Sequence, residues 1–288
     1  MQTFPQKKGV IPIEQVLKTM LENVRAKSPL VHNITNYVTV NDVANVLLAA
    51  GGSPIMSDDA DDVEDITSIC GGLNINIGTL NKNTIPSMFL AGKKANALGH
   101  IVLLDPVGAG ASRLRTDTAN RLMQEVRFDA VRGNISEIKT LCTGSGSTKG
   151  VDADAVDAVT EANLDDGVQL VKAFAQKTGC IIAVTGAIDL VSDGERCWCI
   201  RNGRAEMSRI TGTGCQLSAL MTAFLVANPD RKLDAAAAAV CMMGLAGEIG
   251  WANMQPGDGN STYRDRIIDA IFNMTGDALE EGAKYELR

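Results

Sequence analysis

Residues 101–110 read Ile-Val-Leu-Leu-Asp-Pro-Val-Gly-Ala-Gly. Four consecutive apolar residues predict a strand that is buried on both faces, and Asp105 marks its carboxyl end. The proline and the two glycines that follow end the strand and open a loop. An acid at this position lies at the edge where open α/β sheets bind ligands, although Asp105 could also simply cap the turn.

Short apolar strands alternate with helical patterns on both sides of this stretch. Further strands are expected at 29–34, 53–57, 73–78, 129–133 and 181–186. Helices are expected at 13–27, from an N-cap at Asn41 or Asp42 to Gly51-Gly52, near 61–70, near 84–98, and at 135–141, 162–178, 213–227, 234–251 and 261–274. This alternation predicts an α/β fold, with a mainly parallel central sheet covered by helices on both faces.

Two stretches interrupt the alternation. Residues 188–210 contain short alternating strands separated by Asp-Gly and Asn-Gly pairs, which predict a small antiparallel region. Residues 143–168 are polar and rich in Gly and Asp, so we expect a loop over much of that range.

Composition limits the classes of protein and partner. With 288 residues and 45% hydrophobic content, the chain can bury a large core, and we expect one domain over 1–288. The net charge is −7 and the basic residues are scattered, which argues against nucleic acid as a partner. Seven cysteines, mostly in apolar stretches, indicate a reducing compartment. No apolar run reaches about 18 residues, so we expect no membrane segment and a cytoplasmic location.

The segment Ile210-Thr-Gly-Thr-Gly-Cys-Gln-Leu-Ser218 leads through glycines into an apolar helix, and we expect a strand before it. Backbone N–H groups at such a helix start, here from Gly212, Thr213, Gly214 and Cys215, can bind an anion such as phosphate. An ordinary glycine-containing turn would have the same pattern. The segment matches neither the P-loop nor the dinucleotide-binding fingerprint.

The segment Arg132-Gly-Asn-Ile-Ser-Glu137 is a third candidate, again at the end of an apolar strand. Arg132 could bind phosphate oxygens, and Glu137 could hold Mg²⁺ directly or through water. A surface ion pair between the two is the alternative. Three candidate sites at the carboxyl ends of separate strands would together form one ligand crevice.

These segments resemble the hydroxyethylthiazole kinases of thiamine salvage, which have the ribokinase-like three-layer fold. The resemblance covers nearly the whole chain. It rests on six segments in the right order: His32-Asn-Ile-Thr-Asn-Tyr-Val38, Gly52-Ser-Pro-Ile-Met56, Leu104-Asp-Pro-Val-Gly-Ala-Gly110, Arg132-Gly-Asn-Ile-Ser-Glu137, Ala183-Val-Thr-Gly186 and Thr211-Gly-Thr-Gly-Cys-Gln216.

The resemblance implies an activity and a set of site residues. The activity is transfer of a phosphoryl group from ATP, with Mg²⁺, to the hydroxyl of 4-methyl-5-(2-hydroxyethyl)thiazole. The family is also similar in forming homotrimers with active sites at subunit interfaces. By the same resemblance, Met56 and Gly212 would line the thiazole site with Asn36 as a further candidate, Arg132 and Thr185 would contact ATP, and Asp105 and Glu137 would serve Mg²⁺ and the phosphates.

Cys215 distinguishes the thiazole kinases from related kinases, which have Asp at this position as the base for the substrate hydroxyl. A helix N-terminus lowers the pKa of a thiol, so Cys215 could be partly thiolate and accept a proton. Three alternatives stay open: a hydroxymethylpyrimidine, pyridoxal or sugar kinase, an ATP-dependent dehydratase of hydrated nicotinamide nucleotides, and a nucleotide sensor without catalysis. His32 and His100 have no expected role in catalysis.

Overall fold

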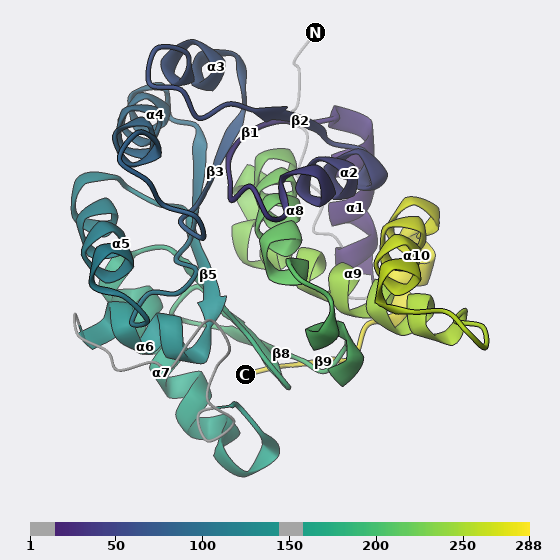
Figure 1. Cartoon of the computed structure of the whole chain (residues 1–288). Coiled ribbons are helices and arrows are strands. Elements are labelled where there is room, and N and C mark those ends of the chain that lie inside the picture. Colours follow the sequence, from purple (N-terminus) through teal and green to yellow (C-terminus); the bar gives the residue numbers. More distant parts are fainter. Residues whose placement is uncertain (1–14, 144–157) are drawn as a thin grey trace, which may run out of the picture.

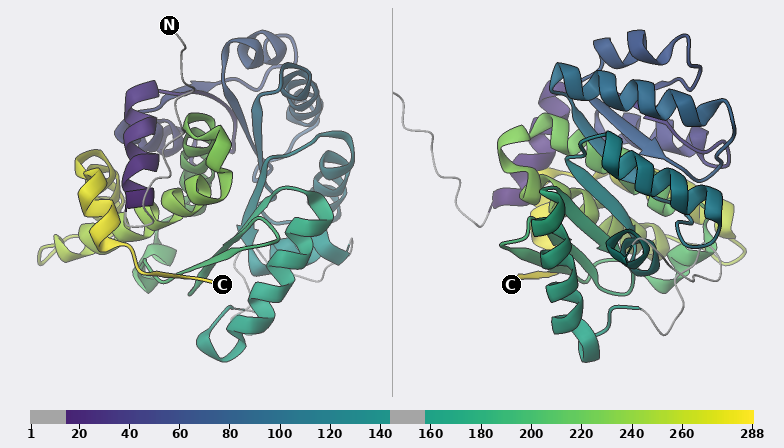
Figure 2. Two further views of the ribbon diagram at one scale, coloured as in Figure 1. Left: turned by 180° about the vertical axis from the view of Figure 1, so that it is seen from behind. Right: turned by 90° about the vertical axis from the view of Figure 1, so that its left-hand side faces the viewer.

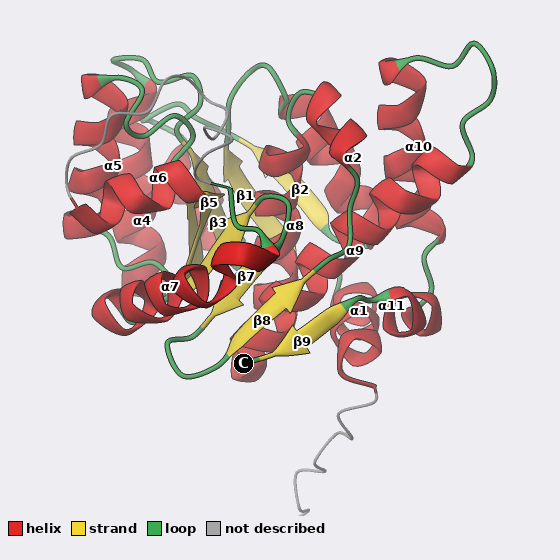
Figure 3. Cartoon of the chain, turned by 90° about the horizontal axis from the view of Figure 1, so that it is seen from below, coloured by secondary structure: helices red, strands yellow, loops and turns green. Residues whose placement is uncertain are grey.

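A nine-stranded sheet forms the centre of the computed structural model, which describes residues 15–143 and 158–288. Six strands pair in parallel, in the order β2 (Ser53–Met56), β1 (Leu30–Ile34), β3 (Gly72–Asn76), β4 (Ile101–Asp105), β5 (Ala130–Asn134) and β6 (Ile181–Thr185). The antiparallel strands β7 (Asp189–Ser192), β8 (Cys197–Ile200) and β9 (Tyr285–Leu287) complete it. The predicted mainly parallel sheet is confirmed, and Figure 3 shows β8 and β9 beside the C-terminus.

Helices cover both faces of the sheet (Figures 1 and 2). One face is covered by α3 (Val63–Ile69), α4 (Thr84–Leu98), α5 (Arg113–Glu125), α6 (Ile135–Thr143) and α7 (Leu164–Thr178). On the other side lie α1 (Val16–Lys27), α2 (Val40–Ala50), α8 (Thr213–Ala227), α9 (Lys232–Ala252), α10 (Asn260–Asn273) and α11 (Gly276–Gly282). The three layers expected from the sequence are therefore present.

The core consists of a large apolar cluster on each face of the sheet. Leu103 of β4 belongs to the cluster on the α8 side, and its neighbour Leu104 belongs to the cluster on the α4 side. Successive residues of a strand point to opposite faces, so a strand covered on both sides favours apolar residues at successive positions. This preference explains why the run 101–104 identified the fold.

Several elements differ from the expectation. The helix α2 begins at Val40, so Thr39 occupies the N-cap position and Asn41 and Asp42 lie in the first turn. A 3₁₀ helix, η3 (Ala205–Arg209), and not a strand, precedes Gly212. A loop was expected at 143–168, but its last residues, 164–168, form the start of α7. The 3₁₀ helix η2 (Glu161–Asn163) precedes them. Residues 144–157 of that loop lie outside the described residues.

Three elements were not expected, namely α5, α11 and β9. Only Thr118, Ala119 and Leu122 of the thirteen-residue α5 are buried. Such a polar sequence has too weak an apolar stripe to predict a helix. The strand β9 has three residues and is specified by its pairing with β8, 85 or more residues earlier in the chain.

One helical stretch of the described residues, Pro229–Ala252, is long and apolar enough to cross a membrane. The inside of the protein buries 78% of its most apolar window. It includes α9, which packs against α8, α10 and the sheet, as the core helix of a globular fold does.

Candidate active site

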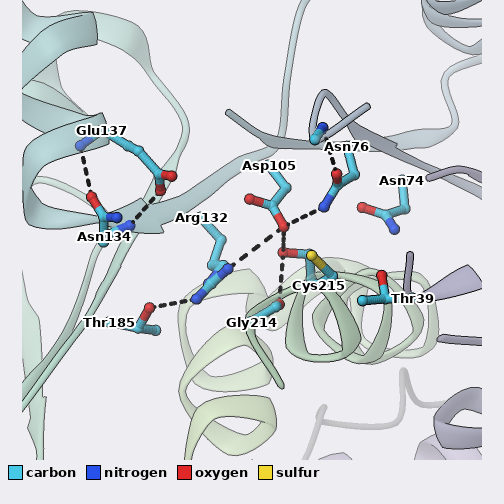
Figure 4. Close-up of polar contacts among 12 residues, drawn as sticks. Thr39, Asn74, Asn76, Asp105, Arg132, Asn134, Glu137, Thr185, Gly214 and Cys215 are labelled. Carbon is cyan, nitrogen blue, oxygen red and sulfur yellow. Dashed lines mark hydrogen bonds and ion pairs between the residues drawn. The ribbon is translucent and has the colours of Figure 1, made fainter. Parts of the chain in front are cut away.

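The carboxylate of Asp105 lies at the carboxyl end of β4 and is completely buried. Its Oδ2 accepts hydrogen bonds from Asn76 Nδ2 on β3 and from Ser218 Oγ on α8, both at 2.8 Å (Figure 4). Its Oδ1 has no partner among the described residues. Because buried polar atoms are almost always hydrogen-bonded, this oxygen is suited to a ligand.

Arg132 of β5 connects Asp105 to the next strand. Its Nη1 lies 3.5 Å from Asp105 Oδ2, and its Nη2 donates to Thr185 Oγ1 of β6 at 2.6 Å. The guanidinium also lies against α8, because a Cβ added to Gly214 would be 2.5 Å from both Nη1 and Nη2. Only a glycine at this position admits the guanidinium in this place. Figure 4 shows Arg132 between Asp105, Thr185 and Gly214.

Burial determines the direction in which the pKa of Asp105 shifts. It raises the pKa of Asp105, and Arg132 opposes part of that rise together with hydrogen bonds from Ser218 and Asn76. A bound cation near the free Oδ1 would favour the charged form further.

Glu137 lies in the first turn of α6 and is also buried. Its Oε1 accepts from Gly108 N and its Oε2 from Asn134 N, each at 2.8 Å, while Glu137 N donates to Asn134 Oδ1. Burial, and next the charge of Asp105, raise the pKa of Glu137 to about 7 against these backbone hydrogen bonds. Glu137 and Asp105 therefore interact electrostatically across the loop that contains Gly108.

The helix α8 begins directly at the site. Its first intrahelical bond runs from Gln216 N to Gly212 O, so the N–H groups of Thr213, Gly214 and Cys215 have no acceptor within the helix. Gly212 has φ +86°, and a Cβ there would be 2.1 Å from Thr39 Cγ2. The expected glycine-containing helix start is thus present, but it follows η3 and not the end of a strand.

The thiol of Cys215 lies close to the start of α8 and accepts from Asn36 Nδ2 at 3.1 Å. Burial and the charge of Asp105 raise its pKa, while Arg132 and the hydrogen bonds lower it, and the net direction is upward. Burial therefore outweighs the charge of Arg132 and the hydrogen bonds from Asn76 and Asn36. The raised pKa favours the neutral thiol over the thiolate.

Asn36 links the Cys215 thiol to the Asp105 carboxylate through hydrogen bonds. Its Nδ2 also donates to Asn76 Oδ1 at 3.1 Å, and its Oδ1 accepts from Thr39 N and Oγ1. Through Asn76 this network reaches Asp105. Sequence reasoning missed Thr39, Asn76 and Ser218. A signal for Asn76 was its place at the carboxyl end of a predicted strand, next to the strand that ends at Asp105.

An apolar surface lies on the other side of Cys215. Met56, at the end of β2, and Val107 pack against a cluster that includes Cys215 and residues of α2 and β1. The structure therefore brings Met56 to the same end of the sheet as the other expected residues. A cavity of about 980 Å³ lies at the opposite end, between the last turns of α5, α6 and α7, and no expected site residue lines it.

His32 of β1 holds the segment that follows Met56. Its Nε2 is 2.9 Å from Ser57 O and its Nδ1 is 2.9 Å from Thr67 Oγ1 of α3. A carbonyl only accepts, so Nε2 carries the proton and Nδ1 accepts from the hydroxyl. Burial lowers the pKa of His32, against the effects of the Ser57 carbonyl and the Asp62 charge.

This lowered pKa predicts a loss of stability in acid. Below about pH 6.5, His32 takes up a proton more readily in the unfolded chain than in the folded chain. The contribution of His32 to the stability of the folded state is therefore complete above pH 6.5 and falls as pH decreases. In urea unfolding from pH 7.5 to 5.5, the stability advantage of wild type over His32→Asn is expected to shrink by up to about 1.4 kcal/mol per pH unit. An advantage that stays constant over this range would contradict the prediction.

Comparisons with known proteins agree on one family. The model described as "Hydroxyethylthiazole kinase family" matches residues 21–277. The hydroxyethylthiazole kinase of Clostridium acetobutylicum is 58% identical over 271 residues, which cover 94% of this chain and 99% of that protein. That of Ruminiclostridium cellulolyticum is 48% identical over 265 residues, covering 92% and 95%.

Solved structures give the same result. The hydroxyethylthiazole kinase protein of Pyrococcus horikoshii superposes with a TM-score of 0.84 at 32% identity, covering 94% of this chain and 98% of that one. Staphylococcus aureus pyridoxal kinase in complex with AMP-PCP and pyridoxal has a TM-score of 0.58 at 14% identity, covering 90% and 98%. This second likeness shows the ribokinase-like fold alone.

Proposed function

This chain belongs to the hydroxyethylthiazole kinase family, and we propose that the cluster around Asp105, Arg132 and Cys215 is where it acts. The enzyme transfers a phosphoryl group from ATP to the hydroxyl of 4-methyl-5-(2-hydroxyethyl)thiazole, a step of thiamine biosynthesis. One observation carries the assignment of the site. A buried carboxylate, with one oxygen that has no partner in the described parts of the chain, lies beside a guanidinium and the N-terminus of α8.

Arg132 and Thr185 contact the phosphates of ATP. The guanidinium has donors that point in a fork, and its place over Gly214 puts it next to the free N–H groups of α8. The amides of Gly212, Thr213, Gly214 and Cys215 hold the phosphoryl group as it moves. Phosphoryl transfer depends mainly on positioning and on neutralising charge, and this cluster supplies both.

Asp105 and Glu137 fit a magnesium site. The described residues contain no group of three or more His, Cys, Asp or Glu side chains able to enclose a metal. Mg²⁺ in kinases needs only one or two carboxylates, since phosphates and waters supply the other oxygens. The free Oδ1 of Asp105 can ligate it, and Glu137 can do so directly or through water. When bound, Mg²⁺ would neutralise charge on the phosphate oxygens.

The thiazole lies against the apolar surface of Met56 and Val107, next to Gly212 and Asn36. A ring with one alcohol arm needs an apolar wall and a polar group at the end of the arm. Met56 and Val107 pack on the cluster that contains Cys215, so the arm can approach the thiol and the start of α8. The raised pKa of Cys215 favours a neutral thiol that orients the hydroxyl over a thiolate that removes its proton.

Variants of Cys215 test this role. Cys215→Ala is expected to lower kcat by roughly 10²-fold, because it removes the group that orients the alcohol. Cys215→Asp should keep or raise activity if a base is useful there. Cys70→Ala, which removes another buried thiol on the α3 side of the molecule, is the control and should leave kcat unchanged. Full kcat in Cys215→Ala with intact binding would contradict the assignment.

The substrate is tested by measuring ADP release with the thiazole alcohol, with and without Mg²⁺. We expect ADP and thiazole phosphate in equal amounts, and only with Mg²⁺. Hydroxymethylpyrimidine, pyridoxal and hydrated nicotinamide nucleotide are the comparison substrates. Faster turnover of any of these, or ADP release without phosphorylated thiazole, would exclude the thiazole alcohol as the substrate.

We also propose a cytoplasmic enzyme with one domain over 1–288, assembled as a homotrimer with active sites at subunit interfaces. Tyr37 and Val38, directly after Asn36, are 76% and 57% exposed, an unusual amount for apolar residues beside a buried site. A neighbouring subunit would cover them. Sedimentation of the purified enzyme should give the mass of a trimer, and a fully active monomer would exclude this assembly.

A further inference from the structure

Two loops contact residues of the proposed site, one beside Glu137 and the other beside Asn36. The loop after β4 contains Gly108, whose N–H holds Glu137 Oε1 at 2.8 Å. The loop after β3 contains Gly78, where an added Cβ would be 3.1 Å from Asn36 Cβ and 3.2 Å from Asn36 Nδ2. Each loop therefore touches one half of the site through its backbone.

The side chain of Arg115, from the first turn of α5, connects these two loops. Its Nη2 donates to Gly78 O at 2.6 Å. Its guanidinium lies over Gly108, because a Cβ added there would be 2.2 Å from Nη1. Gly108 also has φ +73°, a backbone conformation that favours glycine. Both this conformation and the close contact with the guanidinium therefore require glycine at position 108. One guanidinium thus touches the loop of Glu137 and the loop beside Asn36.

The start of α5 holds Arg115 in place. Ser112 is the N-cap and accepts from Arg115 N at 3.3 Å. The hydroxyl of Thr116 accepts from Gly110 N at 2.8 Å. The loop after β4 is therefore tied to α5 at its glycines, and Arg115 extends this tie to the loop after β3. Arg115 thus differs from an ordinary surface arginine, because its guanidinium contacts the backbone of two separate loops, at Gly78 and at Gly108.

We propose that Arg115 is a positioning residue for phosphoryl transfer, setting the distance between the phosphate side, with Asp105 and Glu137, and the alcohol side, with Asn36 and Cys215. The inference rests on the proposed function of this site. In-line transfer needs the attacking oxygen of the alcohol and the leaving oxygen of ADP at a defined separation. A displacement of about 1 Å can reduce the rate about 10²-fold. Without the contacts of Arg115, the alcohol would no longer be held at the correct distance from the phosphoryl group. Water could still accept that group, which gives ADP and inorganic phosphate without thiazole phosphate.

The test compares two variants of Arg115 with one matched control. Arg115→Ala removes the tie, and Arg115→Lys keeps the charge but replaces the planar fork by a point charge. Arg113→Ala makes the same charge change on the same helix, at a side chain that is 94% exposed and pairs only with Asp117 in the described residues. The readouts are kcat, KM for both substrates, melting temperature, and the ratio of thiazole phosphate to ADP.

Arg115→Ala is expected to lower kcat by roughly 30- to 100-fold. The ratio of thiazole phosphate to ADP should fall below one, and added guanidinium chloride at millimolar concentration should restore part of the kcat. Arg115→Lys should be intermediate, and Arg113→Ala should behave as wild type. These changes should appear without a matching loss of folded protein at the assay temperature.

Wild-type kcat and a ratio of one in Arg115→Ala would overturn the inference and leave the proposed function intact. A loss in both Arg115 variants that follows the melting temperature, with no change in the ratio and no rescue, would also overturn it, because it would show a purely structural tie. Absence of thiazole phosphate from the wild-type enzyme would overturn the proposed function and this inference together.

Discussion

Replacing Asp105 by Asn is expected to lower kcat by roughly 10³-fold, because it removes the carboxylate that forms the ion pair with Arg132. Oδ1 has no partner among the described residues, and it is the oxygen that we assign to Mg²⁺. An amide in its place keeps the shape and can still contact Ser218. The loss should therefore appear in kcat, and the Mg²⁺ concentration for half-maximal activity should rise.

Asp129→Asn is the matched control for this variant. Asp129 directly precedes β5, at the opposite end of the sheet, where its carboxylate accepts from Val102 N and pairs with Lys232 at 2.6 Å. The two variants thus remove one negative charge each from a well-bonded Asp. Asp129→Asn should lower the melting temperature and leave kcat within about twofold of wild type, since only stability depends on this ion pair. Equal kcat losses in both variants would exclude a specific role for Asp105.

Replacing Gly214 by Ala is expected to lower kcat/KM for ATP by roughly 10²-fold, because the added Cβ would lie 2.5 Å from both terminal nitrogens of Arg132. The guanidinium must then leave its place between Asp105 and Thr185. The backbone itself should tolerate the change. Position 214 lies in the first turn of α8, and alanine is a better helix former than glycine by about 1 kcal/mol.

Gly259→Ala is the control for this prediction. Gly259 precedes α10, and a Cβ there would meet nothing within 4 Å. It should behave as wild type in every assay. Gly214→Ala should show a normal melting temperature with a higher KM for ATP and an unchanged KM for the thiazole. Wild-type ATP kinetics in Gly214→Ala would mean that the position of Arg132 is not needed for nucleotide binding.

Local patterns predicted most of the layered fold. The runs 101–104 and 181–184 are apolar throughout because both faces of the sheet are covered there, so a short window of sequence suffices to find these strands. The helix α5 escaped prediction because it buries few apolar side chains. Its first turn supplies Arg115, so a helix that the sequence did not predict provides the side chain that contacts both loops.

By itself, the sequence determined the order of the parallel strands and of most helices along the chain, the glycine-rich start of α8 and the family resemblance, since each depends on neighbouring residues. Only the tertiary structure decided which side chains meet. Ser218 reaches Asp105 across 113 residues and Asn36 reaches Cys215 across 179, distances over which no periodic pattern carries information. It also decided the direction in which the pKa of Cys215 shifts, because burial in the folded chain, an effect of distant residues packed around the sulfur, raises that pKa more than Arg132 and the hydrogen bonds to the thiol lower it.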